Sequence, residues 1–214
     1  MESSSRVADT ASMTASMTAS MEIVKGLSSL DVSINTKGQK TAAILRNGQP
    51  ATWTFASPAI PLFQPSTYQA VVTSSTSETS QKLTLCLNVQ PDVLAEAEAI
   101  DAWGIQYAFN NSDRLFGKKL TLEQVMDRYS PIVKKTDKYP PYLKVKLADR
   151  SDRHAPSYWG MDDRKRREPP QNWQKCSLKC HCRVVGFWIM STSFGISVQL
   201  CDALVDDTES MCPF

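Results

Sequence analysis

The sequence predicts a mainly β protein of the α+β class, a description that includes small barrels with one or two helices inserted between their strands. Three observations support this prediction. About six to eight short runs alternate between apolar and polar residues and are separated by turn residues. Two helical segments are grouped in the middle of the chain. The regular strand–helix alternation of a parallel α/β sheet is absent from the sequence.

Length and composition predict one globular domain. The chain has 214 residues, of which 42% are hydrophobic and 21% are charged, and this length suffices to bury a full core. No apolar run approaches the roughly 18–20 residues of a membrane-spanning helix, and the first residues lack the apolar centre of a secretory signal. The unit TASM repeats through residues 10–21, which predicts a disordered leader over residues 1–21. A domain over residues 22–205 and a tail over residues 206–214 follow.

The first half of the domain contains β-type runs that end at turn residues. Alternation is loose over residues 22–35, and a second run covers residues 41–45. Asn47-Gly48 is the dipeptide that tight hairpin turns favour. Three prolines interrupt residues 51–65, so this stretch predicts a strand that continues as an extended crossing. Residues 82–89 alternate strictly and predict a further strand.

Two helices are predicted in the middle of the chain. Pro91 stands where a first-turn proline is favoured, and apolar residues recur at helical spacing from there to Ala108. The polar residues 110–112 end this helix. Thr121 and Gln124 have the spacing of a capping box, which predicts a second helix that starts there and ends before Pro131.

A strand over residues 142–147 carries the strongest binding signal in the chain. Its strict alternation places apolar residues on one face and Tyr142, Lys144 and Lys146 on the other. Single-stranded nucleic acid requires this combination, because cations neutralise phosphates and flat rings stack on bases. The residues that we assign to a nucleic-acid surface are Trp53, Lys134, Lys135, Lys138, Tyr139, Tyr142, Lys144, Lys146, Arg183 and Trp188. The alternative is a solvated strand face with extended lysines.

The last third of the chain predicts a long loop followed by a hairpin. Residues 148–175 are polar and broken by prolines, and they include the basic run 164–167, which is typical of a solvated loop, a phosphate clamp or a nuclear address. Apolar runs at 179–189 and 196–205 predict two strands that residues 191–195 connect.

Charge is distributed unevenly between the body of the chain and its tail. The chain has 24 Lys and Arg against 22 Asp and Glu, a net charge of +2. Its last residues contain Asp202, Asp206, Asp207 and Glu209 and no basic residue; without these four acids, 24 basic residues face 18 acidic ones, a charge of +6. A basic body with an acidic tail that ends in Phe214 is typical of a nucleic-acid binder that screens its own groove, or of a solvated terminus.

The sequence offers little for catalysis. It contains two histidines, no glycine-rich phosphate loop and neither of the patterns HExxH and GxSxG. We therefore predict a protein that is not an enzyme and needs no cofactor or metal. A zinc site of Cys176, Cys180, Cys182 and His181 is the open alternative, although a strand through these residues would point Cys180 and Cys182 to one face and His181 to the other. Buried thiols are therefore favoured.

Five segments, taken in order, resemble one protein family. They are PLFQP (61–65), KLTLCLNV (82–89), NNSDRLFGKKLTLEQVMDRYSPIVK (110–134), KYPPYLKVKL (138–147) and GFWIMSTSFGISVQL (186–200). Their succession resembles the single-stranded DNA-binding proteins of large DNA viruses of algae and protists. That family is in turn similar to the single-stranded DNA-binding protein of short-tailed phages. The resemblance covers residues 22–214.

The resemblance implies an OB-type barrel with inserted helices that binds single-stranded DNA without sequence preference in replication, recombination or repair. It also implies that Asp206, Asp207, Glu209 and Phe214 form a tail that competes with DNA for the groove and docks on a polymerase or helicase. A homodimer is compatible with it, as is an intracellular location in the nucleus, at a viral replication site or in an organelle, and no membrane is involved. The alternative is an OB-like protein-interaction or structural module that binds no DNA.

Overall fold

The computed structural model describes residues 22–34, 38–68, 82–148 and 155–206, and within these ranges the protein is mainly β. The strands before the helices are β1 (Leu27–Ser29), β2 (Ser33–Ile34), β3 (Lys40–Arg46), β4 (Gln49–Thr54), β5 (Ile60–Pro61), β6 (Ser66–Tyr68) and β7 (Lys82–Asn88). The helices are α2 (Pro91–Asn110), α3 (Ser112–Phe116) and α4 (Leu122–Arg128). After them come β8 (Tyr129–Ser130), β9 (Val133–Lys134), β10 (Tyr142–Leu147), β11 (Ser157–Gly160), β12 (Arg166–Arg167), the short 3-10 helix η1 (Trp173–Lys175), β13 (Ser177–Ile189) and β14 (Phe194–Asp206).

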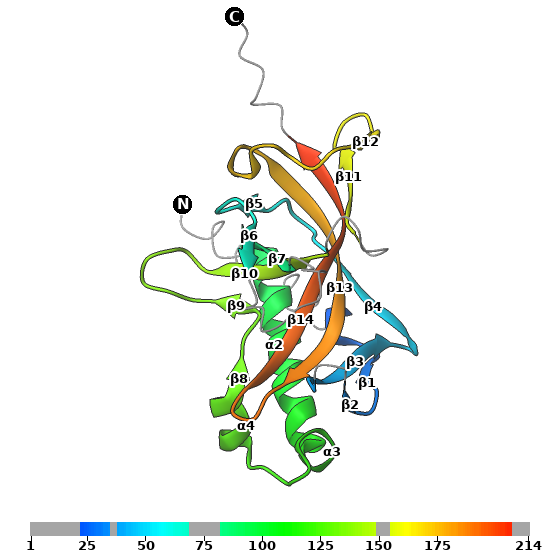
Figure 1. The fold of residues 1–214 in the computed structure, drawn as a ribbon, viewed down its shortest axis with the longest axis vertical. Coiled ribbons are helices and arrows are strands. Elements are labelled where there is room, and N and C mark those ends of the chain that lie inside the picture. The colour runs from blue at the N-terminus through cyan, green and yellow to red at the C-terminus, as the bar shows by residue number, and fades with distance from the viewer. Residues whose placement is uncertain (1–21, 35–37, 69–81, 149–154, 207–214) are drawn as a thin grey trace, which may run out of the picture.

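The long hairpin of β13 and β14 lies at the centre of one large sheet (Figure 1). The hydrogen-bonded path runs β1-β3-β4-β13-β14-β10-β7-β5, and the remaining short strands pair at its sides. β14 is antiparallel to β13 but parallel to β8, β10 and β11, so the sheet is mixed. Among the described strands no pairing joins β1 to β5, and the sheet is therefore open. The predicted β-rich fold is confirmed at this level.

Strands β3 and β4 pair with the same edge of β13, one after the other, and the chain leaves this edge for a short excursion between them. Residues 40–43 and residues 51–54 each pair with β13, one set after the other. Residues 44–50 leave β13 and turn back at Asn47-Gly48, where φ is 52° and 80°. This is the tight turn that the dipeptide predicts, because both of its central residues need positive φ. The excursion pairs with β1 and so extends the sheet beyond β13.

The two predicted helices are confirmed. Pro91 is the first residue of α2, and the capping box of α4 is complete. The Thr121 hydroxyl accepts a hydrogen bond from the Gln124 backbone N–H at 3.3 Å, and the Gln124 side chain accepts one from the Thr121 N–H at 3.1 Å. The short helix α3 was not predicted; it follows α2 directly and ends at Gly117 in the left-handed conformation, with φ of 72°.

The core lies between α2 and the inner face of the β13–β14 hairpin. The ring of Phe187 is 1% exposed and lies 5.9 Å from the ring of Trp103 and 6.0 Å from that of Tyr107. Aromatic pairs at these distances add to the stabilisation that burial provides. The face of the sheet that carries Phe187 is called the inner face below, and the opposite face is the outer face.

A buried carboxylate ties α2 to the segment between α4 and β9. Asp101 accepts hydrogen bonds from the Tyr129 hydroxyl and from the backbone N–H groups of Ile132 and Val133. Burial raises the pKa of Asp101, and these hydrogen bonds oppose that rise. The contacts fix the short segment that precedes Lys134.

One prediction about the fold is wrong. Residues 155–175 do not form a featureless loop, because β11 pairs in parallel with the last residues of β14, and β12 pairs with β11. Tyr158 and Trp173 are each 6% exposed and meet edge to face at 5.7 Å. The strands here are too short for a visible alternation, and their partners are distant in the sequence.

Two predicted segments fall largely beyond the residues that the structure describes. The leader over residues 1–21 lies outside them, as do residues 207–214 of the tail. Asp206, the first residue of the predicted tail, belongs to β14 and pairs with Ser177. None of the helices in the described ranges is long and apolar enough to cross a bilayer.

Candidate nucleic-acid interface

A row of polar side chains crosses five strands on the outer face of the sheet. From β4 to β7 its members are Thr52, Arg183, Gln199, Lys146 and Thr84. Directly paired residues present their side chains to the same face. The row therefore brings two predicted cations, Arg183 and Lys146, to the same face with only one strand between them. Arg183 Nε is buried and has no hydrogen-bond partner among the described atoms.

The alternation predicted for β10 is confirmed. Leu143 and Val145 are 0% exposed and belong to the core, so Tyr142, Lys144 and Lys146 lie on the outer face. Lys134 in β9 pairs with Tyr142 and joins them there. The pairing thus gathers one tyrosine and three lysines from two adjacent strands.

Two adjoining cavities, of about 240 Å³ and about 550 Å³, hollow the outer face between β10 and β13. Lys146, Trp188 and Ser197 line both cavities, so the two form one continuous depression, here called the β10–β13 groove. Its charged lining residues are Lys134, Lys144 and Lys146, and at its far edge Lys40, whose pairing with Ile189 puts the lysine side chain on the inner face. No Asp or Glu from the described ranges lines it.

Trp188 is the aromatic residue that both parts of the groove share. It is half-buried and pairs with Gly195 across the β13–β14 hairpin. A Cβ atom at position 195 would lie 2.8 Å from the indole ring, so only a glycine there lets the ring lie against the strand. The backbone of Gly195 therefore supports one part of the ring while another part remains accessible, as a stacking platform for bases requires.

Two serines hold two of the groove lysines. Lys134 Nζ donates to Ser130 Oγ at 2.9 Å, and Lys146 Nζ donates to Ser197 Oγ at 2.8 Å. Partial burial, and then the charge of Lys144, lower the pKa of Lys134, and Asp101 opposes this. Cations held this close to one another favour an anionic ligand between them.

A second aromatic group extends the surface beyond β7. Tyr142, Asn88 and Ile60 share a row of the sheet. Past this row, the ring of Tyr139 in the β9–β10 hairpin meets the ring of Phe63 edge to face at 5.2 Å. The ammonium group of Lys138 lies 5.3 Å from the centre of the Tyr139 ring. Phe63 is 39% exposed and was not predicted as a site residue.

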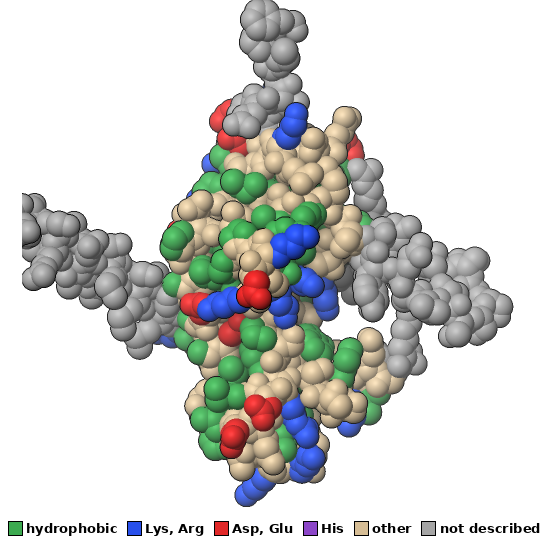
Figure 2. Space-filling view, turned by 90° about the vertical axis from the view of Figure 1, so that its left-hand side faces the viewer, with side chains coloured by type: hydrophobic (Ala, Val, Ile, Leu, Met, Phe, Trp, Pro, Cys, Tyr) green, Lys and Arg blue, Asp and Glu red, His purple; other side chains and the backbone are tan. Residues whose placement is uncertain are grey.

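Cationic side chains extend along the molecule on this side. Figure 2, which views the molecule from the side of the β9–β10 hairpin, shows Lys and Arg side chains at several heights, from the middle of the molecule to its lower end. Fewer acidic side chains lie among them on this face. An acidic side chain lies in the middle of this view beside several cations, so phosphates that follow this side would pass close to it.

The structure gives two of the predicted site residues other partners. Trp53 is 1% exposed, its indole N–H donates to Glu96 at 2.7 Å, and its ring packs on Phe55 at 4.7 Å. It is a core residue, because its strand turns this position inward. Lys135 points away from Lys134 and forms an ion pair with Glu98 at 2.8 Å. Trp53 and Lys135 are therefore not part of the groove.

The cysteine segment is built as a strand, with its thiols inside. Cys180 and Cys182 are buried, and burial is the main cause that raises the pKa of Cys182. His181 lies on the other face, where its Nδ1 is 2.7 Å from the Thr54 hydroxyl oxygen. Within the described ranges no group of three or more His, Cys, Asp or Glu side chains is placed to hold a metal ion.

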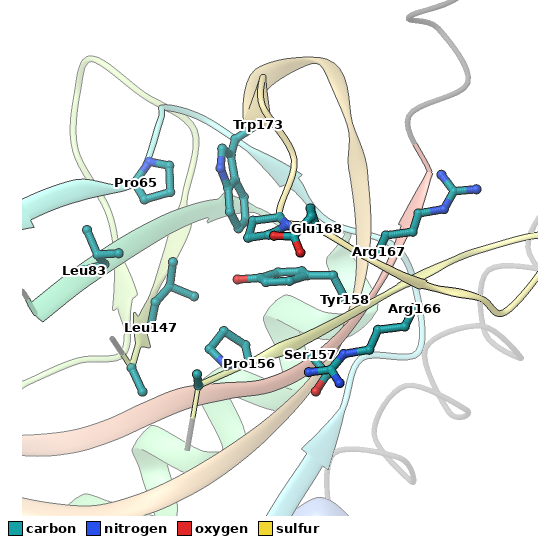
Figure 3. A pocket seen from close by; sticks show the side chains of 13 residues that line it. Pro65, Leu83, Leu147, Pro156, Ser157, Tyr158, Arg166, Arg167, Glu168 and Trp173 are labelled. Carbon is teal, nitrogen blue, oxygen red and sulfur yellow. The ribbon is translucent and has the colours of Figure 1, made fainter. Parts of the chain in front are cut away.

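A separate cavity of about 730 Å³ lies between β10, β11 and η1, and Figure 3 shows it from close by. Tyr158 and Trp173 line its middle, and Leu83 and Leu147 line one side. Arg166, Arg167 and Glu168 lie at its edge. This cavity, here called the Tyr158–Trp173 cleft, opens on the inner side of β10, because Leu147 is a core-facing residue.

No protein-family model matches the chain, and no curated protein matches it.

Proposed function

We propose that the protein binds single-stranded DNA without sequence preference, and that the DNA lies in the β10–β13 groove. The observation that carries this proposal is the content of the groove: three outward-facing lysines and a supported, half-exposed tryptophan, with no acidic lining residue in the described ranges. An OB-type barrel is part of the same proposal. Strands β4, β13, β14, β10 and β7 would supply the wall of that barrel.

The chemistry of the groove suits a flexible, unpaired strand. Lys134, Lys144 and Lys146 would neutralise phosphates and release bound counterions, which makes affinity fall as salt rises. The ring of Trp188 would stack on a base, a contact worth about 1–3 kcal/mol that depends little on which base is present. A duplex has no unstacked base to offer, so it would gain only the phosphate contacts.

The proposed role is to coat and protect DNA during replication, recombination or repair. Asp206 is held in β14 by its pairing with Ser177. The tail that follows it, with Asp207, Glu209 and Phe214, would occupy the groove when DNA is absent and would dock on a polymerase or helicase when DNA displaces it. This role places the protein in the nucleus, at a viral replication site or in an organelle, and it is compatible with a homodimer.

Fluorescence anisotropy tests the proposal with a labelled oligo-dT of about 30 nucleotides, a length that spans more than one typical site. We expect binding to the single strand to exceed binding to a matched duplex. The logarithm of the affinity should fall with the logarithm of salt by about 0.7 for each phosphate contact. Absence of binding, or equal binding of the duplex, would contradict the proposal.

A protein-interaction module is the second candidate, and the Tyr158–Trp173 cleft favours it. Its prolines, aromatic rings and bordering arginines, Arg166 and Arg167, are typical of a surface that binds a peptide. This alternative predicts no change in oligonucleotide anisotropy and a stable complex with a partner protein. Substituting Arg166 and Arg167 would then abolish that complex.

A further inference from the structure

A third cavity continues the β10–β13 groove toward the end of the β13–β14 hairpin. Its volume is about 620 Å³, and Gln39, Lys40, Ile189 and Met190 line both it and the wider part of the groove. The shared residues lie at the ends of β3 and β13, so the two cavities meet at the hairpin end, with the groove on the outer face and the lower cavity on the side of α3 and α4. We refer to the third cavity as the lower cavity, because the hairpin end lies at the lower end of Figure 1 beside α3 and α4.

The lower cavity is also cationic. Lys40, Lys118 and Arg128 line it, and no acidic residue of the described ranges does so. Within those ranges neither Lys118 nor Arg128 forms an ion pair. Phe116 lies in the lining, and the side chain of Met190 is 60% exposed there. Cations beside an accessible apolar surface repeat the chemistry of the groove.

Three elements that are distant in the sequence build this cavity. Lys40 is the first residue of β3, and Arg128 is the last residue of α4. Lys118 follows Gly117, which takes the left-handed conformation after α3, so the chain leaves the helix sharply and carries Lys118 to the cavity. Because these positions come together only in the fold, no motif in the sequence indicates them.

We propose that the single-stranded DNA path continues from Trp188 along β13 into the lower cavity, where Lys40, Lys118 and Arg128 bind phosphates. The inference rests on the proposed function and extends its site. From Arg183 to Met190 the strand advances about 23 Å at about 3.3 Å per residue. Short oligonucleotides would occupy only the groove around Trp188, and longer ones would also fill the lower cavity.

The test compares two oligo-dT lengths, about 6 and about 16 nucleotides, which lie near the two ends of the usual range for one OB-type site. The variant carries Lys118→Glu and Arg128→Glu, which line the lower cavity but not the groove; Lys118 is exposed and Arg128 is half-buried. A control with Lys165→Glu and Arg166→Glu makes the same change of charge on exposed residues of the β11–β12 segment. Anisotropy is measured at about 0.15 M salt, where charges separated by more than about 8 Å are screened.

We expect the variant to bind the longer oligonucleotide at least about tenfold more weakly than wild type and to keep its affinity for the shorter one within about twofold. The control should change neither affinity by more than about twofold. The inference would be overturned if the variant lost affinity equally for both oligonucleotides, or if the control lost as much affinity as the variant. It would also be overturned if the variant bound both oligonucleotides as tightly as wild type. Arg128→Gln, a milder change, should show the same length dependence if the double variant unfolds. Absence of binding by wild type would instead reject the proposed function.

Discussion

The β10–β13 groove and the Tyr158–Trp173 cleft both combine aromatic rings with cations, yet they lie on opposite sides of β10. The groove uses the outward residues Lys144 and Lys146, whereas the cleft uses the inward residue Leu147. Trp188 in the groove is half-exposed, while Tyr158 and Trp173 in the cleft are each 6% exposed. Glu168 lies beside the arginines of the cleft, and no acidic residue among the described ones lines the groove.

The difference shows that residue types alone do not define a nucleic-acid surface. The face of the strand decides which cations and rings are accessible, and the neighbouring acids decide how much charge remains. The neighbouring residues Lys134 and Lys135 illustrate both effects. Lys134 joins the groove and has a lowered pKa, whereas Lys135 pairs with Glu98, which raises its pKa.

Charge reversal in the groove should have the largest effect. With Lys144→Glu and Lys146→Glu, affinity for oligo-dT should fall by roughly a hundredfold or more, because two phosphate contacts become repulsive. Anisotropy at fixed salt measures the loss, and thermal unfolding checks that the variant folds. The matched control in the cleft region is Lys165→Glu with Arg166→Glu. An equal loss in the control would remove the distinction between the two regions.

Loss of the stacking ring should have the next largest effect. Trp188→Ala should weaken oligo-dT binding by about 1–3 kcal/mol, roughly five- to 150-fold, while the salt dependence stays unchanged because no phosphate contact is lost. A salt series on both proteins separates the two quantities. The matched change in the cleft, Trp173→Ala, should leave DNA affinity unchanged in protein that remains folded. A stronger effect from Trp173→Ala than from Trp188→Ala would contradict our account.

Removal of the tail should produce a smaller change of opposite sign. A chain that ends at Asp206, the last residue of β14, should bind oligo-dT roughly two- to tenfold more tightly at low salt, because the acidic residues after it no longer compete for the groove. The gain should vanish near 1 M salt, where the Debye length is about 3 Å. Unchanged affinity at low salt would leave the groove in place and reject the competition mechanism.

The pH dependence should give the smallest effect. The pKa of Lys134 is lowered, so this lysine loses its proton before an ordinary lysine as pH rises. Phosphate binding favours the protonated form of Lys134. Its contribution to the affinity should therefore be fully present at pH values below this pKa and should be lost as pH rises through it. Lys134→Arg stays charged, so wild type should bind about two- to threefold more weakly than the variant near pH 10 and equally near pH 7. Parallel titration curves would reject this role for Lys134.

The sequence predicts the fold best where local signals are strong. Strict alternation located β10 at its observed bounds, Asn47-Gly48 located a turn, and Thr121 with Gln124 located the start of α4. It failed over residues 155–175, where β11 and β12 depend on pairing with β14 and on the contact of Tyr158 with Trp173. Such contacts join distant residues, so no local pattern announces them.

Only part of the site was predicted, because the rest of it also depends on contacts between distant residues. Tyr142, Lys144 and Lys146 followed from alternation on one strand, but the sequence does not show that Trp53 faces the core, where its indole N–H donates to Glu96 in α2. Ser130 and Ser197, which hold two of the lysines, carry no signal of their own in the sequence. The sequence places Trp188 and Gly195 in one hairpin. That the indole ring lies against Gly195 follows only from the register of β13 on β14.

Cross-linking tests the central claim most directly, because it needs no substitution and reports which region touches DNA. An oligonucleotide that contains 5-bromodeoxyuridine is bound to the full chain and irradiated, and the modified residues are identified by mass spectrometry. Our account predicts adducts on Trp188 and on the tyrosines at positions 139 and 142. Adducts confined to Tyr158 or Trp173 would place the DNA at the cleft and contradict it.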